Sequence, residues 1–181
     1  QQRLLAYDDA NGDLHFGAVG ALRATTPLVY GKNILSCSAP QDQSDCHSEY
    51  RVAGQRAGTD DDFGESSSTK VSHKVSGRVG RYRPLLIKQT GQASVASCRA
   101  MCEFEARRRE AKAREATYTV RGWRQESGEL WLPNMVVPVF DPHNDFAGDE
   151  LVIAEVEYSR TDSGTITTLR VGPADAYLPD V

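Results

Sequence analysis

The sequence predicts an α+β fold that is mainly β, namely a small antiparallel β-barrel with one long helix. Three observations lead to this prediction. Short segments that alternate polar with apolar residues recur along the chain with turn residues between them, as in small barrels. Residues 92–116 instead carry their apolar residues at helical spacing. Neither an internal repeat nor the βαβ rhythm of a parallel sheet can be detected in the sequence.

Length and composition are typical of a soluble globular protein. The chain has 181 residues, enough for one sizeable core or two small ones, with 39% hydrophobic and 25% charged residues. The formal net charge of −4 gives no indication of a polyanionic partner. No apolar run reaches about 18 residues, so no membrane span is expected. The chain opens with Gln-Gln-Arg-Leu and no methionine, from which we expect a fragment of a longer protein.

The first 56 residues contain four expected strands. Residues 4–19 predict a hairpin around Asn11-Gly12, a pair that tolerates the positive φ angles of tight turns. A short strand is expected at residues 27–30, and residues 49–56 alternate polar with apolar side chains.

Residues 57–70 are small, acidic and almost free of apolar side chains, which predicts a mobile loop. Within this stretch Asp60, Asp61, Asp62 and Glu65 could together bind a hard cation. The alternating pattern of calcium loops is missing, so a solvated loop is the better interpretation.

Two more strands, residues 71–79 and 84–88, precede the helix predicted over residues 92–116. The apolar stripe of this helix consists of Val95, Cys98, Met101, Cys102 and either Glu105 or Ala106. The opposite face is a ladder of acid–base pairs four residues apart, with the acid first. Each exposed pair of this kind stabilises a helix by about 0.2–0.5 kcal/mol. The pairs are Glu103–Arg107, Glu105–Arg109 and Glu110–Arg114.

The consecutive arginines Arg107, Arg108 and Arg109 allow two interpretations. A basic cluster is typical of nucleic-acid binding, but here glutamates are interleaved and stacking aromatics are lacking nearby. A solvated or subunit-facing side of the helix fits better, and we expect no specific nucleic-acid partner.

Cys98 and Cys102 share one face of the helix because they are four residues apart. They could form half of a metal site, or they could be two small core residues. No His or Cys pair at zinc spacing completes a site, which favours the core. Cys37 with Cys46 and His47 fits no zinc pattern either, so neither a metal nor a cofactor is expected.

From Thr117 onward the apolar period becomes two. Strands are expected at residues 117–123, 130–132, 135–139, 151–159 and 166–171. A loop at residues 141–149 separates two of them, and residues 161–164 are a hairpin turn.

No catalytic constellation is evident, so an enzyme is not expected. The histidines are scattered over different expected elements, at His15, His47, His73 and His143. A Gly-x-Ser-x-Gly elbow and a phosphate-binding Gly-rich loop are both missing from the sequence. Glu155 and Glu157 alternate with apolar residues, which predicts the outward face of a strand. Residues 141–145, Asp-Pro-His-Asn-Asp, could hold a metal, but a Pro-bounded turn is the simpler interpretation.

Trp123 and Trp131 flank the expected turn at Ser127-Gly128. Tryptophan is favoured as an interface anchor. The alternative places both rings opposite each other in the barrel core, and both interpretations remain open at this point.

A series of short motifs runs along the chain. The motifs are Leu28 to Ile34, Tyr50 to Gln55, Arg81-Tyr82-Arg83-Pro84-Leu85, the helix with Arg99-Ala100, Gly122-Trp123-Arg124, Leu130-Trp131-Leu132-Pro133-Asn134 and Leu151 to Val156. This series resembles the tail protein P family of bacteriophage Mu and its prophage relatives. The order of the motifs over some hundred and fifty residues makes the resemblance specific. Members of this family are hub proteins of the baseplate in contractile tails, with two related β-barrels and a small α/β domain between them.

The resemblance implies a domain division and a set of partners. Residues 1–47 would be the C-terminal part of the small α/β middle domain. Residues 48–181 would be the second hub β-barrel, with the helix and with residues 57–70 as a variable insertion. The full-length protein would form a homotrimeric ring that adapts the sixfold tail tube to the threefold spike, in the virion baseplate, after assembly in the bacterial cytoplasm. The expected interface residues are Arg81, Tyr82, Arg83, Trp123, Trp131, Arg107 and Arg108.

Three functional hypotheses follow. The first is a structural baseplate hub protein of a Mu-like phage or prophage, which acts by assembly. The second is a cell-wall hydrolase carried in the tail, which would need an acid pair or a nucleophile beside a histidine in one cleft. The third is a component of a secretion spike of the type VI kind.

Overall fold

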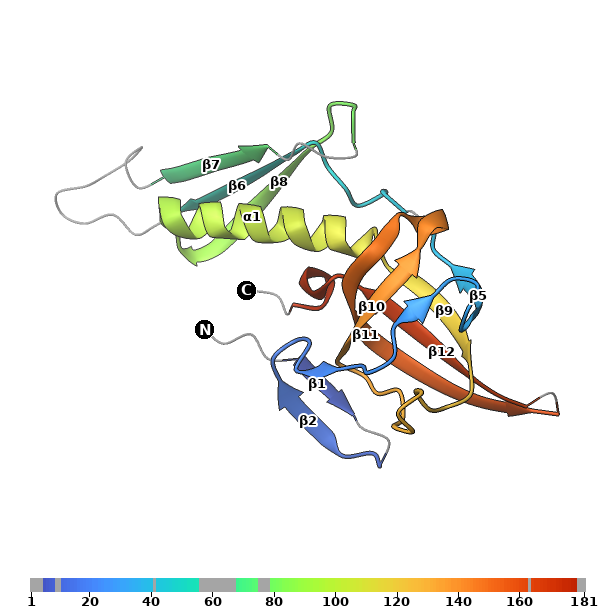
Figure 1. The fold of residues 1–181 in the computed structure, drawn as a ribbon. Coiled ribbons are helices and arrows are strands. Elements are labelled where there is room, and N and C mark those ends of the chain that lie inside the picture. The colour runs from blue at the N-terminus through green and yellow to red at the C-terminus, as the bar shows by residue number, and fades with distance from the viewer. Residues whose placement is uncertain are drawn as a thin grey trace. The chain divides into compact units, whose positions relative to one another are not determined.

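The structure, a computed structural model, describes residues 5–8, 11–40, 42–55, 68–74, 79–162 and 164–178. They form three sheets and one long helix (Figure 1), so the mainly β prediction is confirmed. The chain divides into two compact units, which we call the large unit (residues 1–42 and 111–180) and the helical unit (residues 43–110). The predicted domains, 1–47 and 48–181, were defined by their match to domains of the related family and not by contacts within this chain. They stay a prediction.

The N-terminal hairpin of the large unit pairs β1 (Leu5–Asp8) with β2 (Leu14–Gly17) in antiparallel register. Gly12 lies in the turn at φ 85°, a conformation that glycine adopts without strain. The expected hairpin is confirmed over these residues, while residues 4, 9 and 10 lie outside the described part of the chain.

A seven-stranded sheet forms the body of the large unit. Its strands are β3 (Leu22–Arg23), β4 (Leu28–Val29), β5 (Ile34–Ser38), β9 (Ala116–Arg121), β10 (Met135–Asp141), β11 (Phe146–Thr161) and β12 (Gly164–Gly172). Their order is β3-β10-β11-β12-β9-β5, and β4 also pairs with β10. Strands β3 and β4 run parallel to β10, whereas the other pairs of this sheet are antiparallel. No closed barrel is found among the described strands, so the barrel stays a prediction.

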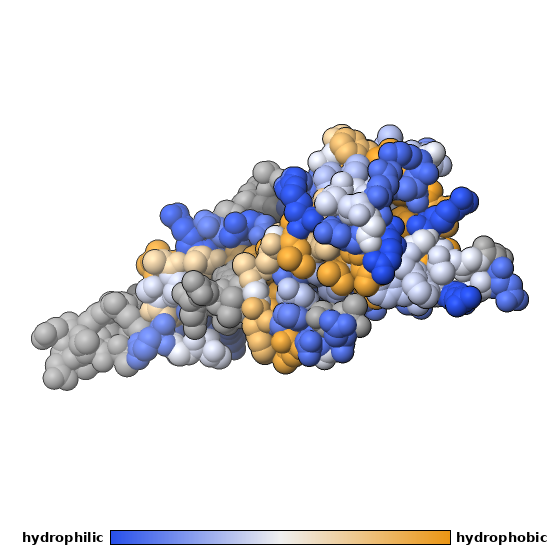
Figure 2. Space-filling view, turned by 60° about the horizontal axis from the view of Figure 1, so that its bottom comes forward, coloured by the Kyte–Doolittle hydropathy of each residue, from blue (hydrophilic) through white to orange (hydrophobic). Residues whose placement is uncertain are grey.

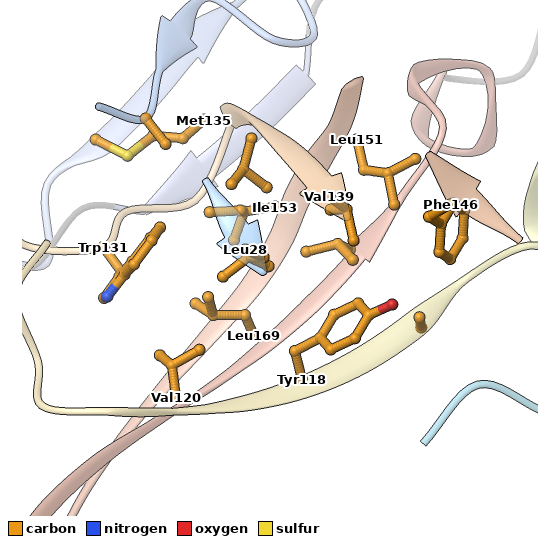
Figure 3. Close-up of a cluster of buried hydrophobic side chains, with 14 residues drawn as sticks. Leu28, Tyr118, Val120, Trp131, Met135, Val139, Phe146, Leu151, Ile153 and Leu169 are labelled. Carbon is orange, nitrogen blue, oxygen red and sulfur yellow. The ribbon is translucent and has the colours of Figure 1, made fainter. Parts of the chain in front are cut away.

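The core of the large unit follows from alternation along these strands. Successive side chains of a strand point to opposite faces, so Tyr118 and Val120 of β9 point inward together. Figure 3 shows how they meet side chains from β4, β10, β11 and β12. The largest fully buried side chains of this core are Tyr118, Leu28, Leu151, Ile153, Leu169, Val120, Val137, Val139 and Val171.

The C-terminal half of the chain differs from the predicted elements in two places. The expected loop at 141–149 contains a 3₁₀ helix, η2 (Pro142–Asn144), and β11 begins already at Phe146. The expected strand at 130–132 is instead a single bridge between Arg124 and Leu130. A last 3₁₀ helix, η3 (Ala174–Tyr177), follows β12.

The helical unit is a three-stranded sheet with one helix. Its strands are β6 (Glu49–Gln55), β7 (Ser68–Lys74) and β8 (Pro84–Gln92), in the order β7-β6-β8, and its helix is α1 (Val95–Lys112). Strand β6 is antiparallel to β7 but parallel to β8. Helix α1 lies along one face of this sheet (Figure 1). None of the helices in the described residues is both long and apolar enough to cross a membrane.

The predicted helix is confirmed, and it is shorter than expected at both ends. Residues 57–67 of the expected acidic loop lie outside the described residues, but residues 68–70 belong to β7, which corrects that part of the prediction. Their composition is polar, yet their backbone pairs with β6 in register from Gln55–Ser68 to Ala53–Lys70. A strand bonded along one side to a central strand needs no apolar side chains of its own to form.

The buried stripe of α1 consists of Cys98, Cys102 and Ala106. These residues pack against Tyr50 and Val52 of β6. The core interpretation of the two cysteines is therefore confirmed. Val95, by contrast, is 65% exposed, so its place in the stripe was wrong.

The acid–base ladder of α1 forms in part. Glu105 and Arg109 make the expected ion pair at 3.0 Å. Arg107 Nε instead donates to the backbone carbonyl of Glu103, and Arg114 pairs with Asp149 of β11 at 3.2 Å.

The close approach of Ala93, just before α1, to β6 requires glycine at position 54, and Gly54→Ala is expected to lower the free energy of unfolding by about 1–3 kcal/mol. A Cβ at Gly54 would come closer than 3.0 Å to the Cβ of Ala93 and to 3.5 Å from the Cys98 sulfur. Ala93 is only 3% exposed and cannot swing aside. Urea denaturation followed by circular dichroism measures the change.

The matched control is Gly80→Ala in the same unit, where an added Cβ meets no atom within 4 Å. Its unfolding free energy should stay within about 0.5 kcal/mol of the parent. Equal losses for both variants would show that the packing of Ala93 against β6 does not depend on Gly54.

Candidate interaction surfaces

The predicted interface residues before β8 have different roles. The Arg83 guanidinium donates to the carbonyl oxygens of Gln43 at 3.4 Å and Cys46 at 3.3 Å, and its backbone amide donates to Ser48 Oγ at 2.7 Å. Arg83 thus ties the start of β8 to the segment before β6. Arg81 is exposed, and Tyr82 is 71% exposed.

On α1, Arg107 and Arg108 lie differently. Arg107 is exposed, whereas Arg108 is half-buried with its guanidinium carbon 5.9 Å from the centre of the buried Phe104 ring. A cation over an aromatic face adds a modest stabilisation. Phe104 is a core residue that the helical spacing of the sequence did not select.

Of the two tryptophans, one is a core residue and the other lies at the surface. Trp131 is only 2% exposed and lies in the core of the large unit (Figure 3). Trp123 is 36% exposed, donates from Nε1 to the carbonyl of Ser159 at 3.0 Å and contacts the Tyr158 ring edge-on. Trp131 is therefore a core residue in this fold, and Trp123 remains a surface aromatic.

One face of the sheet in the helical unit is opposite to the face that packs against α1, and we call it the open sheet face. It consists of Glu49, Arg51, Ala53 and Gln55 of β6 and of Pro84, Leu86, Lys88 and Thr90 of β8. These positions alternate with the residues that face α1. Arg51 is opposite Leu86, pairs with Glu49 and donates to the Tyr82 hydroxyl at 3.4 Å. Leu86 is 62% exposed, so the face has an apolar centre beside basic side chains.

Exposed hydrophobic side chains also occur on the large unit, among them Leu14 and Phe16 of β2, Tyr30 after β4 and Phe140 of β10. Figure 2 shows hydrophobic residues at the surface in patches among hydrophilic ones. Large exposed apolar side chains of this kind are common at protein–protein interfaces.

A groove of about 560 Å³ lies in the large unit. Its lining comprises Asn11, Leu22, Arg23, Arg124, Glu129, Leu130, Leu132 and Met135. It thus offers one carboxylate beside two guanidinium groups on an apolar floor. Arg124 donates to the carbonyl of Gly128 at 2.7 Å, and Arg23 pairs with Glu150.

The polar segment at residues 141–145 is a Pro-containing turn that is closed by a buried carboxylate. Asp141 is fully buried and accepts hydrogen bonds from the Tyr118 hydroxyl at 2.9 Å, the Asn144 side-chain amide at 2.6 Å and the His143 backbone amide at 3.1 Å. The Asn144 amide also reaches the sulfur of Cys37 at 3.2 Å. The expected turn is confirmed, but the complete burial of the Asp141 carboxylate was not expected.

The electrostatics of this cluster suit structure rather than catalysis. Burial favours a higher pKa for Asp141, but the hydrogen bonds from Asn144, Tyr118 and His143 hold that pKa below its usual value. Burial, with the hydrogen bond to Asp141, raises the pKa of Tyr118. Burial likewise raises the pKa of the Cys37 thiol, which disfavours the reactive thiolate at neutral pH.

The histidines whose side chains the structure describes lie on separate elements. Each of the three whose side chains are described lies against a tyrosine ring, namely His15 on Tyr7, His47 on Tyr50 and His143 on Tyr30. Within the described ranges, no group of three or more His, Cys, Asp or Glu side chains is placed to hold a metal ion.

Comparison with known proteins agrees with the motifs. Residues 94–180 match the family described as the fourth domain of Mu phage baseplate assembly protein GpP. The whole chain is 30% identical over 183 aligned residues to baseplate hub protein gp44 of Escherichia phage Mu. The resemblance to the Mu tail protein P family is confirmed. The match covers 98% of this chain and 48% of the Mu protein, so the chain spans about half the length of this relative.

Solved structures of two tail proteins share the fold. The chain superimposes on the 43 kDa tail protein of prophage MuSo2 from Shewanella oneidensis with a TM-score of 0.80 and 26% identity, over 97% of this chain and 50% of that protein. For the tail protein from Neisseria meningitidis MC58 the TM-score is 0.74 at 18% identity, over 97% and 54% of the two chains. The second likeness concerns the fold alone.

Proposed function

We propose that this chain is a structural part of the baseplate hub in the contractile tail of a Mu-like phage or prophage. The observation that carries the proposal is the relation to the Mu baseplate hub protein, which runs along 98% of this chain at 30% identity. The tail protein of prophage MuSo2 supports it with a shared fold over nearly the same length. Since the chain spans about half of these relatives, the proposal concerns the part of the hub that this half builds.

The protein acts by assembly and not by catalysis in this proposal. A tail-borne glycosidase needs two facing carboxylates in one cleft. Among the residues that line the groove of the large unit, Glu129 is the one carboxylate, together with Arg23 and Arg124, which is a different arrangement. Asp141 is fully buried and hydrogen-bonded, so it cannot meet a substrate. No cofactor and no specific nucleic acid are needed for the proposed role.

The finer features expected from the family belong to the same proposal. Residues 1–47 correspond to the end of the small α/β middle domain, and residues 48–181 correspond to the second hub β-barrel. The full-length protein forms a homotrimeric ring that joins the tail tube to the central spike in the virion, after assembly in the bacterial cytoplasm. A hub of this kind needs large interfaces, and exposed Arg81, Tyr82, Arg107 and Trp123 are suitable for them.

Gold-labelled antibodies raised against this chain test the proposal on tails released from the strain that encodes it. The expected result in electron micrographs is label at the baseplate end of the tail, which competition with the soluble chain removes. Tails that carry no label, or label spread along the tube, would overturn the proposed place in the baseplate. Tails prepared after deletion of the gene serve as the control for antibody specificity.

A further inference from the structure

The groove of the large unit lies at an open edge of the seven-stranded sheet. Strand β3 ends the strand order on one side of this sheet, and its residues Leu22 and Arg23 line the groove. The backbone amides of Leu22 and Ala24 donate to β10 and the residue before it, at the carbonyls of Val136 and Asn134. Because the backbone groups of a strand alternate in direction, the N–H and C=O of Arg23 point away from β10. Among the residues that the structure describes, this amide has no hydrogen-bond partner.

The neighbouring part of the same edge is already occupied by the chain itself. Gln125 Oε1 accepts from the backbone amide of Thr25 at 2.8 Å, and the hydroxyls of Thr25 and Ser127 are 2.8 Å apart. The turn that contains Gln125 and Ser127 therefore covers the edge after β3 and leaves Arg23 open. The groove is the space that remains between β3 and residues 124–132, with the buried Met135 at its base.

The charges that line the groove are balanced. Arg23 is already paired with Glu150. Arg124 and Glu129 remain, and neither of them has an ion-pair partner in the described part of the chain. A polyanion is bound by many cationic side chains together, whereas the large unit contains sixteen Asp and Glu against nine Lys and Arg. The lining therefore fits a ligand that carries both signs of charge, and not a nucleic acid.

The apolar lining indicates the shape of the ligand. Leu22, Leu130 and Leu132 line the groove, and Leu22 is 39% exposed. In an extended peptide every second side chain points to the same side. Such a peptide can bond through its main chain to the N–H and C=O of Arg23 while its apolar side chains contact the leucines, which is how sheet edges recognise peptides. The groove volume of about 560 Å³ is within the usual range of ligand sites, about 300–1,000 Å³.

We propose that this groove binds an extended segment of another tail protein by strand addition at β3. The segment has apolar side chains at alternate positions, an acidic residue for Arg124 and a basic residue for Glu129. The proposal rests on the proposed hub function, which brings other tail proteins to this chain, and it names the site and the chemistry of one such contact. A second copy of the chain is not needed to complete the site, because β3 and residues 124–132 belong to one chain.

Overlapping short peptides from the other tail proteins of the same phage or prophage are the probes, and the whole chain is the receptor. Fluorescence polarisation measures the binding of each labelled peptide, and at least one peptide with the proposed pattern is expected to bind. The Arg23 amide should then exchange its hydrogen with deuterium at least about tenfold more slowly, because it becomes hydrogen-bonded. Unchanged exchange at Arg23 in the presence of a bound peptide would overturn strand addition at β3.

Two variants at position 23 separate the backbone contact from the side chain. Arg23→Pro removes the amide donor, and proline is tolerated where the N–H of an edge strand faces solvent. It should weaken peptide binding about tenfold. Arg23→Ala removes the pair with Glu150 but keeps the donor, so peptide binding should stay within about threefold of the parent. Equal losses for the two variants would contradict a backbone contact at this position.

Arg124→Glu tests the side-chain contact, and it also serves if Arg23→Pro does not fold. The variant should bind the peptide at least about tenfold more weakly. A peptide whose acidic residue is replaced by lysine should bind to Arg124→Glu again. The control is Arg121→Glu, because Arg121 is exposed on β9 and does not line the groove. Arg121→Glu should bind the original peptide like the parent, and a loss equal to that of Arg124→Glu would contradict the assigned contact.

Three further outcomes would overturn the inference. They are a peptide set from which nothing binds, binding by peptides of this chain in place of those from other tail proteins, and binding of a DNA oligonucleotide that Arg124→Glu abolishes. Antibody label at the baseplate end of the tail does not depend on this groove. If that label is present while the peptides fail, only the assignment of the groove has failed. If the label is absent, the proposed hub function itself has failed.

Discussion

Replacement of Trp131 by alanine is expected to lower the free energy of unfolding by about 3–5 kcal/mol. The ring is 2% exposed and lies in the core cluster at the end where Val120 and Met135 are seen in Figure 3. Truncation removes its contacts and leaves a cavity that the rigid strands around it cannot fill. Urea denaturation followed by circular dichroism at neutral pH provides the measurement.

Trp123→Ala is the matched control, because the same side chain is removed from the surface of the same unit. This variant loses one hydrogen bond to Ser159 and an edge contact with Tyr158. Its free energy of unfolding is expected to fall by about 1–2 kcal/mol. Equal losses at the two positions would contradict the assignment of Trp131 to the core and Trp123 to the surface. If Trp123 serves an interface, its replacement should also weaken assembly while the fold persists.

The strands and the helix could be predicted because their spacing is a local property. The apolar period of α1 identified Cys98 and Cys102, and the alternation that begins at Thr117 identified β9 as a strand. The ends of elements were less certain, since they depend on turns. Strand β11 begins five residues before its predicted start, because Asp145 at φ 57° returns the chain so that Phe146 pairs with Asp141.

Spacing does not say which side of an element other parts of the chain will cover. Val95 has the helical spacing of the buried stripe but is exposed, while Phe104 lies outside that stripe and is buried. The sequence of β6 and β8 predicts two faces of a sheet, but which face α1 covers is decided by packing between segments forty to fifty residues apart. For the same reason the two tryptophans could not be told apart before the structure.

The buried cluster at Asp141 also depends on long-range contacts. The sequence shows a turn with Pro142, and the carboxylate would be solvated in an isolated turn. It is buried here because β9 supplies Tyr118 and β5 brings Cys37 beside Asn144. Neither contact can be predicted from the residues that are close to Asp141 in the sequence.

Replacement of Asp141 by alanine is expected to lower the free energy of unfolding by about 2–4 kcal/mol at neutral pH. The change removes the acceptor of three hydrogen bonds and leaves the buried Tyr118 hydroxyl without it, and each bond to a charged group contributes about 1.5–3 kcal/mol. Asp162→Ala, at an exposed carboxylate, is the control and should change stability by less than about 0.5 kcal/mol. Comparable losses for the two variants would contradict a structural role of the Asp141 carboxylate.

The pH dependence of the same variant separates the charge of Asp141 from its volume. The folded pKa of Asp141 lies below its usual value of about 3.9, so its charged form stabilises the fold fully above that pH. This contribution is lost as the pH falls through the folded pKa, because the unfolded chain binds the proton first. The difference in unfolding free energy between parent and Asp141→Ala should therefore be constant from pH 5 to 7 and shrink below about pH 4. A difference that stays the same down to pH 2 would mean that packing, and not the hydrogen-bonded carboxylate, carries the effect.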